Sequence, residues 1–385
     1  MVSDRSSTGG VSAQGDKLIC LALPCLCIGG AETVTLSLAK EFLRMGHRVD
    51  LATGWRVSEP NLPLSPPEGA RHVCLGVRQT RGVVFPFRDY LQREQPDAVI
   101  TSMWPFTVAT LMAHRLANSR ARIATWEHST ISVQYANRGF LHDQLLRKTI
   151  AHFYPMAHER VAVSAGVADD LAELSGLPRQ SFTVISNPMP LVITPKPPAE
   201  VTDRIWDGWK GPRIVTVGRL KAPKNHAFLL RAFKKLLAKL DARLMIVGEG
   251  ELTEETKALA RSEGIADKVF FPGPTIDPLP YYHSADLFVL SSTREGSPTV
   301  IIEALACGLP VVSTECRSGP AEILEKGRYG KLTPVGDMDA LADAMIESLH
   351  AQHDPESLKR RAADFEPHRI ADQFFRLLFP TTEKA

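Results

Sequence analysis

The sequence predicts an α/β fold with two domains, each winding helices around a parallel sheet, and a linker between them. Three observations support this prediction. The chain has 385 residues, more than one ordinary hydrophobic core accommodates, so two domains of about 150 to 200 residues are expected. Short apolar runs alternate with amphipathic stretches, as they do in βαβ units. A proline-rich stretch interrupts this alternation near the middle of the chain, after which it begins again.

These observations divide the chain into five parts. Residues 1–16 have the polar composition of a disordered tail. The first doubly wound domain is expected at residues 17–188, the linker at 189–212 and the second domain at 213–366. Residues 367–385 contain an amphipathic helix with no strand after it, and we expect this helix to cross back onto the first domain. Ligands of parallel sheets bind at the carboxyl ends of the strands, so the two domains should face a central cleft.

Each expected strand is a short run of apolar and β-branched residues. In the first domain these runs are residues 18–23, 47–52, 98–101, 122–126, 160–164 and 182–185, with helical patterns between them such as 31–45, which Gly46 closes. In the second domain the expected strands are residues 214–217, 243–247, 268–271, 287–290 and 311–313, and the expected helices are 227–240, 252–264 and 339–349. Strands separated by helices in this rhythm predict one parallel sheet in each domain.

The charge composition limits the classes of function. A formal net charge of +2 with 23% charged residues indicates neither a nucleic-acid-binding protein nor a disordered acidic chain. Residues 71–93 are locally basic and carry Phe85, Phe87 and Tyr90. This segment of the first domain either rests on an anionic membrane surface or forms a solvated loop and helix.

The cysteines and the hydrophobic runs predict a cytoplasmic protein. Several of the six cysteines lie in apolar strand or helix contexts, so all are expected to be buried free thiols of a reducing compartment. Cys25 and Cys27 have the wrong spacing for a CxxC redox or zinc pair, and no second pair accompanies them, so no metal site is predicted. The apolar run at residues 18–28 is too short to span a bilayer.

The most informative motif occupies residues 294–308, which follow an apolar run at residues 286–292 that is expected to be a buried strand. The motif itself contains a turn and the start of a helix. Gly296 and Ser297 form the turn, and Pro298 suits the first helical position because its missing N–H costs nothing there. The N–H groups of the first helical turn, that of Thr299 included, have no partner within the helix. An anion such as phosphate would therefore be stabilised by the backbone alone.

Two glutamates flank this predicted phosphate site. Glu295 lies at its rim. Glu303, five residues beyond Pro298, lies roughly 7 to 8 Å along the helix, within reach of a neighbouring sugar hydroxyl. A surface glutamate is usually just solvated. However, Glu303 lies in a helix that is apolar on nearly all sides, where an ionised side chain is costly without partners. The motif therefore predicts one site for a phosphate and a sugar together.

Two other strand ends supply candidate phosphate-binding residues. In the second domain Gly218 allows close approach, and Arg219 and Lys224 are suited to neutralise a diphosphate. In the first domain Gly29 and Gly30 join a strand to a helix, and they either approach phosphates or form a tight turn.

His128 also follows a strand, and it either has a structural role or contacts a reacting centre. Two remaining motifs have plainer explanations. Asp337 and Asp339 match a DxD metal-binding pattern but are expected to cap a helix. The loop at residues 248–250 either approaches a nucleotide or merely turns the chain.

Taken together, seven segments resemble glycosyltransferase family 4: residues 29–32, 46–49, 163–164, 185–187, 218–220 with Lys224, 247–250, and 295–298 with 303–304. The resemblance extends over nearly the whole chain from Lys17. It implies the GT-B fold, with an acceptor-binding first Rossmann-like domain and a second one that binds the nucleotide sugar. It also implies sugar transfer with retention at the anomeric carbon, without a metal and without any cofactor.

The resemblance implies roles for single residues. Arg219 and Lys224 would hold the donor diphosphate, Glu303 the ribose hydroxyls and Glu295 the transferred sugar, which His128 would also contact. The residues implied in donor binding are Gly29, Gly30, Gly218, Arg219, Lys224, Gly296, Ser297, Pro298, Thr299 and Glu303, and those implied in catalysis are His128, Glu295, Arg219 and Lys224. Many relatives have a bulky apolar residue where this chain has Ser297.

Residues 312–324 are similar to those of a subgroup that builds cell-surface glycans, often on polyprenyl-linked acceptors. The implied partners are a nucleotide sugar, with UDP commoner than GDP in the family, and a glycan or polyprenyl-linked acceptor. These partners would suit a cytoplasmic protein whose first domain makes peripheral contact with the inner face of the membrane. Two alternatives stay open: a nucleotide-sugar epimerase of the same fold, which would isomerise the donor without acceptor, and a non-catalytic nucleotide-sugar-binding protein.

Overall fold

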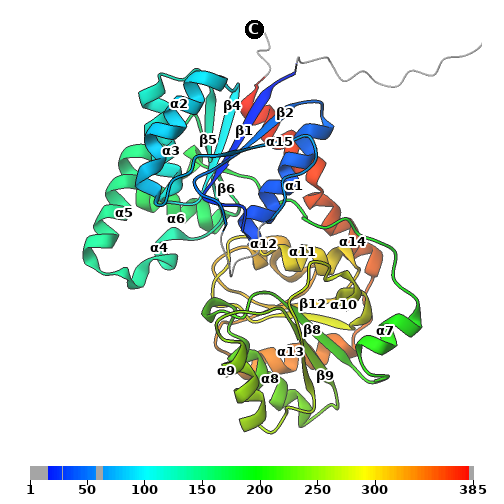
Figure 1. The fold of residues 1–385 in the computed structure, drawn as a ribbon. Coiled ribbons are helices and arrows are strands. Elements are labelled where there is room, and N and C mark those ends of the chain that lie inside the picture. The colour runs from blue at the N-terminus through cyan, green and yellow to red at the C-terminus, as the bar shows by residue number, and fades with distance from the viewer. Residues whose placement is uncertain (1–15, 28, 58–63, 381–385) are drawn as a thin grey trace, which may run out of the picture.

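The computed structural model describes residues 16–27, 29–57 and 64–380, and it contains two α/β domains, one above the other in Figure 1. Of the expected tail at residues 1–16, only Asp16 lies within the described residues, where its carboxylate accepts a hydrogen bond from Arg48 Nε (3.0 Å). Each domain has its own parallel sheet and its own hydrophobic core. The expected α/β fold with two doubly wound domains is confirmed.

Among the described residues, the N-terminal sheet has seven parallel strands in the order β3-β2-β1-β4-β5-β6-β7. Their bounds are β1 Leu18–Leu23, β2 Arg48–Thr53, β3 Arg71–Cys74, β4 Ala98–Ser102, β5 Arg122–Glu127, β6 Glu159–Ala162 and β7 Thr183–Val184. The central strands are buried on both faces, as strands covered by helices on both sides must be. The order reverses between β1 and β4, and sheets of this kind bind ligands at such a point, beyond the carboxyl ends of the strands.

In the part of the chain that the structure describes, six α-helices lie between the strands of this domain in the sequence: α1 Gly30–Arg44, α2 Val84–Glu94, α3 Phe106–Ala117, α4 Ile131–Gln134, α5 Phe140–Phe153 and α6 Ala165–Ser175. Helix α1 shows how the sequence specifies them. Its buried face repeats at helical spacing through Val34, Leu38 and Phe42. It ends before Gly46, whose φ of +86° suits a residue without a side chain.

The C-terminal sheet has six parallel strands in the order β10-β9-β8-β11-β12-β13. Their bounds are β8 Arg213–Val217, β9 Arg243–Val247, β10 Val269–Gly273, β11 Leu287–Leu290, β12 Val311–Thr314 and β13 Lys331–Thr333. The helices are α7 Ala199–Ile205, α8 His226–Leu237, α9 Thr253–Ser262, α10 Leu279–Ser284, α11 Thr299–Ala306, α12 Pro320–Ile323, α13 Met338–His350 and α14 Pro355–Ala362, and the chain continues into α15 Pro367–Leu378. One apolar cluster packs on each face of this sheet.

The segment expected to be a linker, residues 189–212, packs on the C-terminal domain. It contains helix α7, and Trp206 directly after that helix is buried in one of the domain's two apolar clusters. The indole N–H of Trp206 donates to Ser284 Oγ (2.9 Å). This segment is therefore part of the second core as well as a connection.

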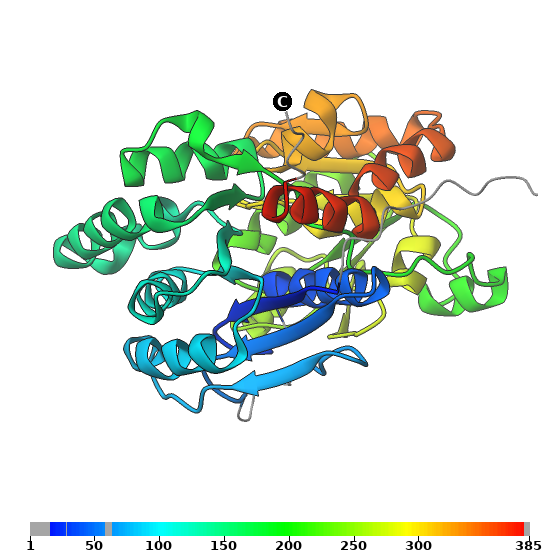
Figure 2. The same ribbon diagram turned by 90° about the horizontal axis from the view of Figure 1, so that it is seen from above.

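The chain returns to the N-terminal domain at its end. Helix α15 packs against α1 and β5, and Figure 2 shows α15 in red beside the dark blue α1. Ile370, Phe374 and Leu378 recur on one face of α15 and are buried in the core of the N-terminal domain. The last strand before the linker and the last helix of the chain thus belong to the same domain.

Two edge strands, β3 and β13, were not expected from the sequence. Both are short and partly exposed, so they lack the apolar run that marked the inner strands. Strand β3 opens the basic segment at residues 71–93. Within that segment Phe87 and Tyr90 are buried on α2, and Phe85 alone of the three aromatic residues is exposed.

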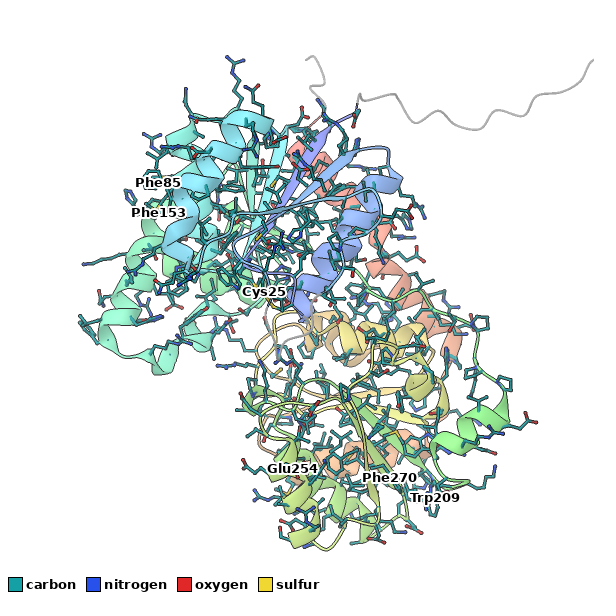
Figure 3. The ribbon with its side chains drawn as sticks, in the orientation of Figure 1. Cys25, Phe85, Phe153, Trp209, Glu254 and Phe270 are labelled. Carbon is teal, nitrogen blue, oxygen red and sulfur yellow. A yellow bond between two sulfur atoms is a disulfide. The ribbon has the colours of Figure 1, made fainter. Side chains whose placement is uncertain are left out.

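The expectation of six free thiols is wrong for one pair. Cys25 and Cys27 form a disulfide, because the backbone between them is bent at Leu26 and leaves the two Cα atoms 5.6 Å apart. Cys20, Cys74, Cys307 and Cys316 are free. Figure 3 places Cys25 at the end of the N-terminal domain that faces the C-terminal domain. Among the described residues, no helix is both long and apolar enough to cross a bilayer.

Candidate active site

Lys224 and Glu295 form an ion pair at the carboxyl end of the C-terminal sheet. Lys224 follows β8 and Glu295 follows β11, and these two strands are neighbours in the sheet. Lys224 Nζ donates to Glu295 Oε1 (2.6 Å), and Ser292 Oγ donates to the same oxygen (2.6 Å). Only 24% and 12% of the two side chains are exposed, so solvent screens this pair less than a surface pair.

Gly218 lies next to the side chain of Lys224 in this ion pair. A Cβ at Gly218 would lie 3.6 Å from Lys224 Cε. The backbone of Gly218 also packs closely against the loop after β9. A Cβ at Gly248 in that loop would lie 2.1 Å from the Gly218 carbonyl oxygen. Gly250 approaches Leu220 in the same way, at 2.4 Å. Close packing of two loops therefore accounts for Gly248 and Gly250. An approach of the loop at residues 248–250 to a nucleotide stays a prediction.

Glu303 is buried on α11 and has a partner that the sequence did not reveal. The hydroxyl of Tyr282 on α10 donates to Glu303 Oε2 (2.8 Å). Burial raises the pKa of Glu303 above its ordinary value, while hydrogen bonds from Tyr282 and Thr299 act in the opposite direction. Glu303 is 5% exposed, so the carboxylate needs these donors. The implied contact of Glu303 with a ribose remains a prediction.

His128 lies at the end of β5, packed on the Trp126 ring with 4.3 Å between the ring centroids. Its Nδ1 is 3.1 Å from Asn187 Oδ1, and its Nε2 is buried without a hydrogen-bond partner among the described residues. Burial lowers the pKa of His128 to about 4, so the ring is neutral at physiological pH.

The turn after β11 touches this histidine across the domain boundary. A Cβ at Gly296 would lie 1.9 Å from the His128 carbonyl oxygen, so only glycine fits at this position. Asn187 Nδ2 donates to the carbonyl oxygen of Ser297 (3.0 Å). The predicted phosphate-binding turn and the predicted sugar-contacting histidine are therefore brought together.

Three further contacts hold the domains together beside this point. Ser164 Oγ and Ser318 Oγ are 2.8 Å apart. The backbone N–H of Ala165, at the start of α6, donates to both carboxylate oxygens of Glu322 (3.0 and 2.8 Å). The third contact joins Arg294 Nη1 to the Val133 carbonyl oxygen (2.9 Å). Each contact joins a segment that follows a strand of the N-terminal sheet to a segment that follows a strand of the C-terminal sheet.

Helix α11 begins at Thr299, one residue later than expected. Pro298 lies at the N-cap with φ −72° and ψ 102°, rather than at the first helical position. Ser297 precedes it, and its hydroxyl oxygen is buried without a partner among the described residues. The strand, turn and helix otherwise follow the predicted order.

Gly29 and Gly30 lie at the start of α1, opposite the loop after β8. Glu32 in the first turn of α1 is buried, and burial raises its pKa, while the positive charges of Arg219 and Lys221 on the other domain lower it. A Cβ at Gly30 would meet nothing within 4 Å, whereas a Cβ at Gly29 would lie 2.3 Å from Glu32 Oε2. The Gly29–Gly30 turn thus faces Arg219 across the boundary between the domains.

Cys25, Cys27 and Glu32 form a cluster of metal-ligating residue types in the described part of the chain, with their ligand atoms within 4.8 Å of one another. Cys27 Sγ lies 3.3 Å from Glu32 Oε1. The two sulfur atoms are bonded to each other, and a disulfide does not supply the thiolate that metal ions bind. The cluster therefore does not fit a metal ion in this form.

Glu127, directly before His128, is a buried carboxyl group without a cationic partner among the described residues. Its Oε1 accepts hydrogen bonds from Thr107 Oγ1 (2.7 Å) and the Tyr154 hydroxyl (2.6 Å), and its Oε2 from the Trp104 N–H (3.4 Å). Burial raises the pKa of Glu127 to about 7 despite these donors. The sequence gave no signal for this group, because its partners come from α3, the loop before α3 and the turn after α5.

The DxD pattern is a helix cap, as expected. Asp337 is the N-cap of α13, and its Oδ1 accepts a hydrogen bond from the Ala340 N–H (2.9 Å). Asp339 forms an ion pair with Lys235.

Comparison with known proteins identifies the family. The description "Glycosyltransferase Family 4" matches residues 28–192, and "Glycosyl transferases group 1" matches residues 211–351. An N-acetylgalactosaminyltransferase of Campylobacter jejuni, which acts on an N-acetylgalactosamine-N,N'-diacetylbacillosaminyl-diphospho-undecaprenol, is 30% identical over 271 residues. The match covers 68% of this chain and 70% of that protein. The amylovoran biosynthesis glycosyltransferase AmsD of Erwinia amylovora is 27% identical over 305 residues, covering 78% of this chain and 81% of AmsD.

The fold agrees with these relatives. The crystal structure of Anabaena HepE in complex with UDP superposes with a TM-score of 0.75 at 19% identity, over 94% of this chain and 99% of HepE. The family expected from the sequence motifs is thereby confirmed, and the chain belongs to the glycosyltransferases of family 4.

Proposed function

We propose that this glycosyltransferase moves a sugar from a UDP-linked donor to a hydroxyl of a glycan or polyprenyl-linked acceptor during synthesis of a cell-surface polysaccharide. Transfer proceeds with retention at the anomeric carbon and without a metal ion. The relatives support the acceptor class, since the Campylobacter jejuni enzyme acts on a diphospho-undecaprenol and AmsD belongs to amylovoran biosynthesis. HepE, which was crystallised with UDP, supports the nucleotide.

The observation that carries this proposal is the partly buried Lys224–Glu295 pair at the carboxyl end of the C-terminal sheet. An ammonium group has three N–H donors, and Glu295 takes one of them, so two remain for diphosphate oxygens. Arg219 is exposed in the same loop and adds a second positive charge. These cations would stabilise the negative charge that develops on the departing diphosphate, the task that a metal ion performs elsewhere.

The same pair positions Glu295 for the sugar. Lys224 and Ser292 both donate to Oε1, so Oε2 is the oxygen that would accept a hydrogen bond from a sugar hydroxyl. A carboxylate held by two donors is a poor nucleophile. We therefore place the acceptor on the same face of the sugar as the leaving group. The bond from C1 to the phosphate oxygen breaks, the bond from C1 to the acceptor oxygen forms, and the acceptor proton passes to the phosphate oxygen.

A donor and acceptor assay tests this function. The purified protein is incubated with UDP-sugars and a polyprenyl-diphosphate-linked sugar, and the anomeric configuration of the product is read from its NMR coupling constants. Lys224→Ala should reduce transfer at least tenfold, because a charge-assisted contact to the leaving group is lost. Lys234→Ala, which removes a lysine paired with Glu263 on the outside of α8, is the matched control and should keep wild-type activity. An inverted product, or a glycosyl-enzyme adduct seen by mass spectrometry, would exclude the retaining same-face route.

We further propose that the N-terminal domain rests on an anionic membrane on its cytoplasmic side, where a polyprenyl-linked acceptor would lie. Phe140, Leu141 and Leu145 at the start of α5 are 75%, 83% and 57% exposed. Leu141 and Leu145 recur at helical spacing with exposed Lys148, and exposed Arg138 precedes the helix. Apolar side chains beside basic ones suit a surface of anionic lipids. Helix α5 lies on the outer edge of the domain (Figure 1), shortly after the segment that carries His128.

Vesicle sedimentation tests this contact. The wild-type protein should bind vesicles that contain phosphatidylglycerol and should bind pure phosphatidylcholine vesicles less. A variant with Leu141→Glu and Leu145→Glu should lose binding, whereas Ile276→Glu, at a site in the C-terminal domain that is 93% exposed, should not. Equal binding by all three proteins would contradict the assignment of this surface.

A further inference from the structure

Asn187 bridges the two halves of the candidate active site. It lies after β7, where the chain leaves the N-terminal sheet, and it is 6% exposed. One end of its side-chain amide faces His128 Nδ1 (3.1 Å) and the other end faces the carbonyl oxygen of Ser297 (3.0 Å). A single buried side chain therefore contacts both a residue of the N-terminal domain and the turn before α11.

These two contacts determine the tautomer of His128. The carbonyl oxygen of Ser297 can only accept, so the amide must present its NH₂ group to Ser297 and its oxygen to His128. An amide oxygen can also only accept, so His128 Nδ1 must carry the hydrogen. In a neutral imidazole the other nitrogen then bears the lone pair. His128 Nε2 is this nitrogen, and it is buried without a partner among the described residues.

We infer that Asn187 is a positioning residue that holds His128 in the Nδ1–H tautomer, so that Nε2 accepts a hydrogen bond from a hydroxyl of the transferred sugar. The inference rests on the proposed transfer reaction for the identity of the ligand. A buried nitrogen that can only accept a hydrogen bond favours a sugar with a hydroxyl group placed to donate to His128 Nε2. A sugar that lacks this hydroxyl leaves the nitrogen unpaired, which is costly.

The side-chain amide of Asn187 also links recognition of the sugar by His128 to the contact between the two domains. Asn187 can meet Ser297 only when the turn before α11 lies against the end of β5, where Gly296 contacts the His128 backbone. His128 is therefore held in its accepting form by the arrangement that also brings the turn of the predicted phosphate site next to it.

The tautomer can be measured in the protein alone. Histidine labelled with ¹⁵N gives long-range proton–nitrogen correlations that distinguish Nδ1–H from Nε2–H, and His128→Gln identifies the signals of His128 by their loss. We expect wild-type His128 in the Nδ1–H form at neutral pH. Asn187→Leu, which removes both hydrogen bonds with a side chain of similar shape, should shift the population toward Nε2–H. Asn187→Asp keeps an oxygen facing Nδ1, so Nδ1 should stay protonated in that variant.

Kinetics then test the consequence for the sugar. Asn187→Leu should lower kcat/KM for the donor by about tenfold to a hundredfold, because a buried donor or acceptor is left unpaired. A series of deoxy-sugar donors should show one position at which the wild type loses activity and Asn187→Leu loses none. An Nε2–H tautomer in the wild type would overturn the inference, and so would an unchanged tautomer in Asn187→Leu. A protein with the expected tautomer but no transfer with any acceptor would instead contradict the proposed function.

Discussion

Gly296→Ala tests whether the contact between the two domains sets the geometry of transfer. The new Cβ would lie 1.9 Å from the His128 carbonyl oxygen and 2.7 Å from its carbon, whereas ordinary contact begins at 3.4 Å. Both opposing atoms are backbone, so no side-chain rotation relieves the clash. The two loops must separate by about 1.5 Å, the difference between the required and the available distance. Displacements of about 1 Å in a reacting geometry cost on the order of a hundredfold in rate.

We therefore expect kcat/KM to fall about a hundredfold, which corresponds to about 2.7 kcal/mol. A clash absorbed inside one domain would instead cost about 1–3 kcal/mol of stability, or roughly 2–12 °C in Tm. Because the clash lies between domains that can part, we expect Tm to fall by less than about 2 °C. Steady-state kinetics and thermal unfolding of the same preparation separate the two effects.

Gly30→Ala serves as a control for the stability measurement, since its Cβ would meet nothing within 4 Å. Its Tm should equal that of the wild type or rise slightly, as alanine favours the helix. If Gly296→Ala retains kcat/KM within about threefold of the wild type, the close approach of Gly296 to His128 has no part in transfer. A large fall in Tm would show that the contact stabilises the fold instead.

Three further predictions follow from the buried groups. Burial raises the pKa of Glu127 from the ordinary 4.5 to about 7, so the unfolded chain loses this proton first and stability should fall as pH rises from about 4.5 to 7. Glu127→Gln should remove that part of the pH dependence in thermal unfolding. If Tm changes with pH in the same way in the variant and the wild type, the raised pKa of Glu127 is disproved. Phe374→Ala, which empties a fully buried site where α15 packs on the N-terminal domain, should cost about 3–5 kcal/mol in urea unfolding. The exposed Phe85→Ala should change stability by less than about 0.5 kcal/mol, and equal losses would show that α15 contributes little. Glu303→Ala should mainly raise the donor KM and Glu295→Ala should mainly lower kcat, each by about tenfold to a hundredfold, and the reverse pattern in steady-state kinetics would exchange their roles.

Hydrophobic periodicity was enough to place the inner strands and the long helices. Strands β9 and β11 have the predicted bounds, and α1 differs from prediction by one residue at each end. The edge strands β3 and β13 escaped prediction because they are only four and three residues long and mix polar with apolar side chains, which leaves no apolar run to recognise. Helix α7 was expected to be part of a linker, since prolines surround it and its burial depends on the distant core of the second domain.

The residues of the candidate site also fall into those that the sequence indicates and those that only the structure shows. Gly218, Lys224 and Glu295 could be found from the sequence because each follows an apolar strand, and parallel strands deliver their carboxyl ends to one edge of the sheet. The partner of Glu303 could not be found, since Tyr282 lies on a separate helix, 21 positions away. The disulfide between Cys25 and Cys27 depends on the backbone conformation at Leu26, which the cysteine spacing does not specify.

The sequence by itself determined the two α/β domains, the family and most residues of the candidate site, because these depend on local periodicity and on short motifs at strand ends. Only the tertiary structure decided which groups from different domains meet. Asn187 joins His128 to Ser297, and Gly296 rests on the His128 backbone. The physical reason is that hydrogen bonds and close contacts act over a few ångströms. Residues 59 and 110 positions apart come within that range only when both domains have folded and packed together.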